Sequence, residues 1–167
     1  RIVGLVVGMR TMKSKRGDDI AFVQLDDRTA RIEVTLFADV YRSCREHVVK
    51  DNFLVVEGVV SLDDFSGALR MRANEAYTLG EARRRFAREL VLQLGWEDFG
   101  PDFPEALGRL LGGGRSREGC AVRVLYSAPD ARAEISLGAE WRLSPSDEAL
   151  GRLRERFGPE RVLLRYA

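Results

Sequence analysis

The sequence predicts an α+β protein in which a closed five-stranded β-barrel precedes a small βαββαβ domain. Two observations predict this fold class. Apolar and polar residues alternate through most of residues 2–79, which is typical of half-buried strands. Residues 90–167 instead combine short apolar runs with two amphipathic helical patterns. The predicted domains are therefore residues 1–79 and 90–167, joined by a charged helical linker over residues 80–89.

The clearest alternation lies at Ile20–Phe37, on both sides of the polar segment Asp26–Thr29. This pattern predicts a β-hairpin, and aspartate suits its turn because the carboxylate accepts backbone N–H groups. Ile2–Met12 predicts a long strand before the hairpin. Lys13–Asp18 predicts a basic loop that joins the two.

Ala38–Val49 has apolar residues at helical spacing and predicts a helix. Phe53–Leu62 and Ala68–Leu79 predict two further strands, joined by a loop at Asp63–Gly67. The OB-fold has this element order: three strands, a helix and two strands. Its second and third strands bind oligonucleotides, together with the loop between strands 1 and 2 (L12) and the loop between strands 4 and 5 (L45). On this mapping Lys13–Asp18 and Asp63–Gly67 are the two binding loops.

The second domain shows helix-start signals at Pro104 and at Ser144–Asp147, where Ser144 is the expected N-cap. Its β-α-β-β-α-β order matches the ferredoxin-like pattern, with a related open α/β layer as the alternative. Neither fold alone implies a function. The predicted strands and the first predicted helix are Leu90–Leu94, Cys120–Tyr126, Ala133–Leu137, Arg161–Tyr166 and Glu105–Leu111.

The net charge of +1 gives the chain no global attraction for nucleic acid, so any binding must come from a local patch. The apolar runs are too short to span a membrane. Cys44 and Cys120 are isolated, which indicates a reducing, cytoplasmic setting without disulfides. His47 is the one histidine and no Cys-x-x-Cys motif is present, so neither a metal nor a cofactor is expected.

A local basic patch is expected around the loop that follows the first strand. Its cations could track a phosphate backbone, and nearby phenylalanines could stack on bases. The alternative for Phe22 and Phe37 is that both belong to the barrel core. The candidate nucleic-acid-binding residues are Arg10, Lys13, Lys15, Arg16, Phe22, Phe37, Phe65, Arg70 and Arg72.

Two adjacent carboxylate pairs, Asp26-Asp27 and Asp63-Asp64, raise the hypothesis of a two-metal nuclease. Both pairs lie in predicted hairpin turns, where aspartate is favoured for backbone reasons, and we prefer that interpretation. Trp96 and Trp141 are candidates either for a partner surface or for ordinary packing.

Three separated segments, Val6–Phe37, Gly58–Glu75 and Asp130–Leu150, resemble the C-terminal part of the alpha subunits of bacterial DNA polymerase III. The resemblance covers essentially the whole chain. It implies a non-catalytic fragment of a DNA-directed DNA polymerase, because the catalytic aspartates of that family lie in a palm domain that these residues do not include. No cofactor is implied for this region.

The resemblance also implies partners. The OB domain of the family contacts single-stranded template DNA, the domain after it binds the tau subunit of the clamp loader, and the sliding clamp is bound by regions outside this chain. The partner-binding candidates are Trp141, Arg142, Arg165 and Tyr166. An RNA-binding OB module, such as the anticodon-binding domain of an aminoacyl-tRNA synthetase, is the alternative function.

Overall fold

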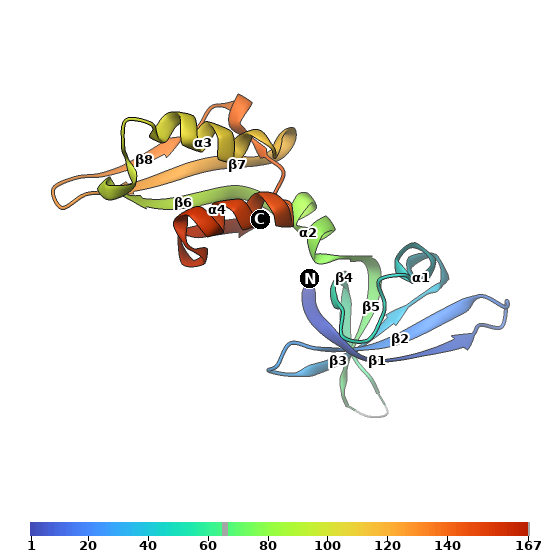
Figure 1. Cartoon of the computed structure of the whole chain (residues 1–167). Coiled ribbons are helices and arrows are strands. Elements are labelled where there is room, and N and C mark those ends of the chain that lie inside the picture. The colour runs from blue at the N-terminus through green and yellow to red at the C-terminus, as the bar shows by residue number, and fades with distance from the viewer. Residues whose placement is uncertain (65–66, 167) are drawn as a thin grey trace. The chain divides into compact units, whose positions relative to one another are not determined.

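The computed structural model describes residues 1–64 and 67–166 and divides the chain into two compact units, Arg1–Leu79 and Gly80–Ala167 (Figure 1). The division falls at the predicted end of the first domain. Each unit has a hydrophobic core of its own.

The first unit is a closed barrel with strand order β1-β2-β3-β5-β4. Neighbouring strands are antiparallel except for β3 and β5, which run parallel. This arrangement confirms the predicted OB-fold. The elements are β1 (Ile2–Lys13), β2 (Asp19–Asp26), β3 (Arg31–Leu36), α1 (Ala38–Cys44), β4 (Phe53–Leu62) and β5 (Leu69–Tyr77).

Alternate residues of every barrel strand point inward and are buried, as half-buried strands require. Helix α1 adds Cys44 to this core, and Val48 just beyond the helix adds a second apolar side chain. The helix is shorter than predicted and ends at Cys44, and the N–H groups of His47 and Val48 in the turn after it both donate to the Cys44 carbonyl. Val48 thus keeps the apolar spacing of a helix without being helical.

The second unit is a four-stranded sheet with order β8-β7-β6-β9, and α3 and α4 pack on it (Figure 1). Strands β6 and β7 are direct parallel neighbours. In a ferredoxin-like split βαβ unit another strand separates them, so the open α/β alternative describes this unit. The elements are α2 (Leu79–Phe86), β6 (Ala87–Gly95), η1 (Trp96–Asp98), α3 (Phe103–Gly112), β7 (Arg115–Ser127), β8 (Arg132–Ser136), η2 (Ala139–Trp141), α4 (Asp147–Phe157), η3 (Pro159–Arg161) and β9 (Val162–Tyr166).

Two predicted boundaries differ from the structure. Residues 80–89 are not a separate linker, because they form most of α2 and the start of β6, with Phe86 and Ala87 buried. Helix α4 begins two residues later than its signal suggested. Its N-cap is Ser146, whose hydroxyl accepts the N–H of Ala149, rather than Ser144.

Among the described residues, no helix is both long enough and apolar enough to cross a membrane.

Candidate functional site

The outside of the barrel carries two rows of residues, each crossing β1, β2, β3 and β5. Both rows point outward, because alternating residues such as Val23 and Met71 are buried in the core. We call the two rows the cross-strand face. The first row is Arg10, Phe22, Thr35 and Arg72, and the second is Gly8, Gln24, Glu33 and Arg70.

The guanidinium group of Arg10 lies over the ring of Phe22, 4.1 Å from its centroid. Phe22 is therefore neither barrel core nor a bare stacking platform, because a cation already occupies one side of its ring. A guanidinium plane can itself stack on a base. The pair presents an arginine surface that is backed by an aromatic ring.

Glu33 lies between two arginines of the cross-strand face. Its Oε2 accepts a hydrogen bond from Arg10 at 3.3 Å, and its Oε1 lies 3.4 Å from Nε of Arg70. Arg70 also pairs with Asp63 at 2.6 Å. Two of the predicted DNA-binding arginines are thus neutralised within the protein, a feature that their sequence positions did not reveal.

Ser14 shapes the basic β1–β2 loop. Its hydroxyl oxygen accepts the N–H groups of Arg16 and Asp18, and Gly17 adopts a positive φ of 87°. Lys13 pairs with Asp19 at 2.8 Å. Lys15 and Arg16 are exposed and form no ion pair within the described residues, so they are available to a phosphate.

Of the remaining nucleic-acid-binding candidates, Arg72 and Phe37 are accessible and Phe65 is not described by the structure. Arg72 is exposed and, within the described ranges, has no carboxylate partner. Phe37 follows β3 directly and 46% of its surface is exposed, so its ring is accessible and is not barrel core. Phe65 lies outside the described residues.

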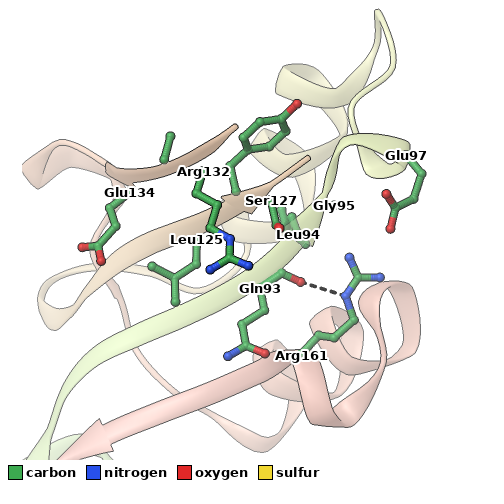
Figure 2. A pocket seen from close by; sticks show the side chains of 11 residues that line it. Gln93, Leu94, Gly95, Glu97, Leu125, Ser127, Arg132, Glu134 and Arg161 are labelled. Carbon is green, nitrogen blue, oxygen red and sulfur yellow. Dashed lines mark hydrogen bonds between the residues drawn. The ribbon is translucent and has the colours of Figure 1, made fainter. Parts of the chain in front are cut away.

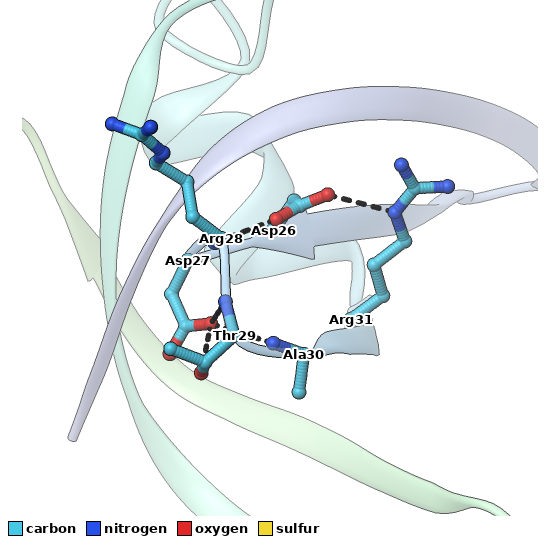
Figure 3. Close-up of polar contacts among 6 residues, drawn as sticks. All are labelled: Asp26, Asp27, Arg28, Thr29, Ala30 and Arg31. Carbon is cyan, nitrogen blue, oxygen red and sulfur yellow. Dashed lines mark hydrogen bonds and ion pairs between the residues drawn. The ribbon is translucent and has the colours of Figure 1, made fainter.

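The carboxylates of Asp26 and Asp27 both accept hydrogen bonds within the β2–β3 turn (Figure 3). Asp27 Oδ1 accepts the Thr29 hydroxyl at 2.6 Å and the N–H groups of Thr29 and Ala30 at 2.9 Å. Asp26 accepts the Arg31 guanidinium and the N–H of Arg28. The Thr29 hydroxyl and these backbone bonds lower the pKa of Asp27 to about 2.

This geometry supports the turn interpretation over the metal interpretation. Asp26 has a lowered pKa as well, chiefly because of Arg31. Across residues 1–64 and 67–166, no cluster of three or more His, Cys, Asp or Glu side chains is arranged to hold a metal ion.

One face of the second unit's sheet faces away from both helices. Leu90 and Leu92 share a core with α3 and α4, so Glu89, Val91 and Gln93 lie on the opposite face, where Val91 is itself fully buried. An ion-pair network crosses that face from Glu134 through Arg123 and Glu89 to Arg165. Glu134 and Glu89 together raise the pKa of Arg123.

Beside this network lies a hollow of about 650 Å³ (Figure 2). It is lined by Gly95 and Ser127, where β6 and β7 end, and by Arg132 and Arg161. Arg161 donates to the Gln93 carbonyl at 2.7 Å and pairs with Asp98. The hollow lies on the sheet face opposite α3 and α4.

The predicted partner-binding residues fall into two groups. The guanidinium of Arg115 lies 3.9 Å from the centroid of the Trp141 ring, and Arg142 donates to the Gly119 carbonyl, so both residues make contacts within the unit. Arg165 and Tyr166 are exposed on the edge strand β9. Trp96 is the more exposed tryptophan, at 60%.

The closed five-stranded barrel defines the first unit as an OB-fold domain. In agreement, the family model for the OB-fold nucleic acid binding domain matches residues 1–79. A second model, for the C-terminal domain of DNA polymerase III subunit alpha, matches residues 116–158. The chain belongs to the DNA polymerase III alpha subunit family and corresponds to the C-terminal region of these subunits.

Individual relatives match almost the whole chain. DNA polymerase III subunit alpha of Pseudomonas fluorescens is 40% identical over 99% of it, and that of Escherichia coli K12 is 42% identical over 98%. The chain spans only 14% of the length of either relative. A mitochondrial single-stranded DNA-binding protein of S. cerevisiae matches 47% of this chain and 88% of its own at a TM-score of 0.37 and 16% identity, a likeness too low to support an argument.

Proposed function

We propose that this chain is a non-catalytic binding module of a replicative DNA polymerase. Its OB unit holds single-stranded template DNA, and its second unit docks the tau subunit of the clamp loader. The observation that carries the DNA proposal is that Arg72 and the Arg10–Phe22 pair share one face with β2 and β3, the strands that the OB-fold uses for oligonucleotides.

Binding to DNA should be weak and should depend on salt. Lys15, Arg16 and Arg72 are the predicted cations that remain unpaired within the described residues, which allows only a few phosphate contacts. The exposed ring of Phe37 and the Arg10 guanidinium offer stacking surfaces that accept any base. Little preference for sequence is therefore expected.

The docking proposal rests on the second unit and on the family. The sheet face opposite α3 and α4 carries the hollow beside Arg132 and Arg161. Trp96 and Tyr166 are exposed, and aromatic residues of this kind are enriched at protein interfaces. We propose that the sliding clamp binds regions of the polymerase outside this chain.

Fluorescence anisotropy with a labelled single-stranded oligonucleotide across a salt series tests the DNA proposal. Replacing Lys15, Arg16 and Arg72 together by alanine removes up to three phosphate contacts. The slope of log K against log[salt] should then flatten by roughly 2, at about 0.7 per contact. The matched control changes the same amount of charge in the second unit, through Arg109→Ala, Arg117→Ala and Arg154→Ala.

An unchanged slope in the first variant, with the fold intact by circular dichroism, contradicts the proposed DNA-binding surface. Competition with unlabelled tRNA tests the RNA alternative, because an anticodon-binding module would prefer tRNA to single-stranded DNA of equal length.

A further inference from the structure

The carboxylate of Glu33, in the second row of the cross-strand face, contacts an arginine from each row. Glu33 comes from β3, and it contacts Arg10 of β1 at 3.3 Å and Arg70 of β5 at 3.4 Å. The Glu33 side chain is 20% exposed, whereas Arg10 and Arg70 are 62% and 46% exposed. The carboxylate is thus partly covered by two cations that solvent and ligands can still reach.

We propose that Glu33 limits the affinity of this face for single-stranded DNA by competing with phosphate for Arg10 and Arg70. The inference rests on the proposed function of the OB unit. A phosphate that binds either arginine must displace the carboxylate or approach its negative charge. Each paired arginine therefore contributes less to DNA binding than Arg72, which has no carboxylate partner in the described chain.

The barrel does not need this carboxylate for its fold. Glu33 lies outside the apolar core, and ion pairs between partly exposed groups contribute little to stability. Arg10 has a second support, since its guanidinium lies 4.1 Å from the centroid of the Phe22 ring. Removing the negative charge should leave Arg10 over its ring and free it for DNA.

Arg70 is restrained more strongly than Arg10. Asp63, with a side chain only 15% exposed, holds it at 2.6 Å in addition to Glu33. The gain on removing the Glu33 charge should therefore come mainly through Arg10. A limited affinity of this kind suits single-stranded DNA that has to move across the cross-strand face.

The test is the Glu33→Gln variant, because glutamine keeps an acceptor oxygen but has no charge. Anisotropy with the same labelled oligonucleotide should show roughly three- to tenfold tighter binding at low salt, with a salt slope steeper by about 0.7 per released arginine. Glu57→Gln is the matched control. It removes the same charge from a barrel glutamate that pairs with Arg1 at 2.9 Å, outside the cross-strand face.

The gain should shrink when Glu33→Gln is made in an Arg10→Ala background, because the released cation is then missing. Equal or weaker binding by a folded Glu33→Gln variant overturns the inference and leaves the proposed function standing. A gain just as large in the Arg10→Ala background, or in Glu57→Gln, overturns it too, because general charge would then explain the effect. No binding by the unmodified chain at low salt would instead contradict the proposed function.

Discussion

At the scale of single residues, the β2–β3 turn depends on the carboxylate of Asp27. Three donors from Thr29 and Ala30 converge on one of its oxygens. Arg28, between Asp27 and Thr29, adopts a positive φ of 72°, a conformation that residues other than glycine rarely take. The hydrogen bonds to Asp27 help to hold the chain in this conformation.

The lowered pKa of Asp27 predicts a pH dependence of stability. Folding favours the charged form, so the contribution is fully present above the ordinary pKa of 3.8 and is lost as pH falls toward about 2. Asp27→Asn should lower Tm at pH 7, and the gap to the unmodified chain should narrow between pH 4 and pH 2. Thermal unfolding followed by circular dichroism measures this gap. Asp130→Asn, in an exposed turn of the second unit, is the control, and a gap that stays constant with pH contradicts the prediction.

The residues of the cross-strand face show what sequence can and cannot predict. Strand parity is enough to place Arg70 and Arg72 on the outside of the barrel, because they alternate with the apolar residues Met71 and Ala73. The contact of Glu33 with Arg10 and Arg70 could not be predicted, because it joins three strands whose register is set by the closed barrel. The stacking of the Arg10 guanidinium on the Phe22 ring depends on the same strand register.

At the scale of elements, β4 and β5 pair closely at a bulge between Glu57 and Gly58. A Cβ atom at Gly58 would lie 2.1 Å from the carbonyl oxygen of Arg72 and 3.0 Å from Cα of Ala73. Glycine is therefore required at this position, because two backbones approach each other there.

Gly58→Ala should force the two strands apart and destabilise the barrel by about 1–3 kcal/mol, the range typical of overpacking. It should also weaken DNA binding, because Arg72 is on the displaced strand. Urea unfolding and anisotropy measure the two effects. Gly8→Ala is the control for stability, since its added Cβ would meet only Gln24 at an ordinary 3.9 Å. Equal stability of the two variants would contradict the proposed close approach.

Local patterns predicted the barrel elements well, because each strand alternates and each turn has its own chemistry. They predicted the second unit less well. The parallel pairing of β6 with β7 joins residues that are far apart in sequence, and no local signal reports it. The charged run before β6 looked like a linker, although Phe86 and Ala87 are buried in the structure.

At the scale of the whole molecule, the chain has two separate hydrophobic cores. The core of the first unit comes from the barrel strands and α1, and that of the second comes from β6, β7, β9 and the helices α3 and α4. The division between Leu79 and Gly80 leaves both cores intact. Each unit should therefore fold alone, since a domain is stabilised by its own core.

This division predicts that the two proposed binding functions can be separated. A protein of residues 1–79 should bind single-stranded DNA within about threefold of the whole chain, because the cross-strand face and the basic loop are both included. A protein of residues 80–167 should bind the tau subunit and should not bind DNA. Surface plasmon resonance with immobilised tau measures the first of these. As controls, residues 1–79 are tested for binding to tau and residues 80–167 for binding to DNA. Circular dichroism checks that both proteins are folded. Loss of DNA binding by a folded 1–79 half would show that the second unit contributes to the DNA site. Tau binding by the 1–79 half, or none by a folded 80–167 half, would contradict the assignment of docking to the second unit.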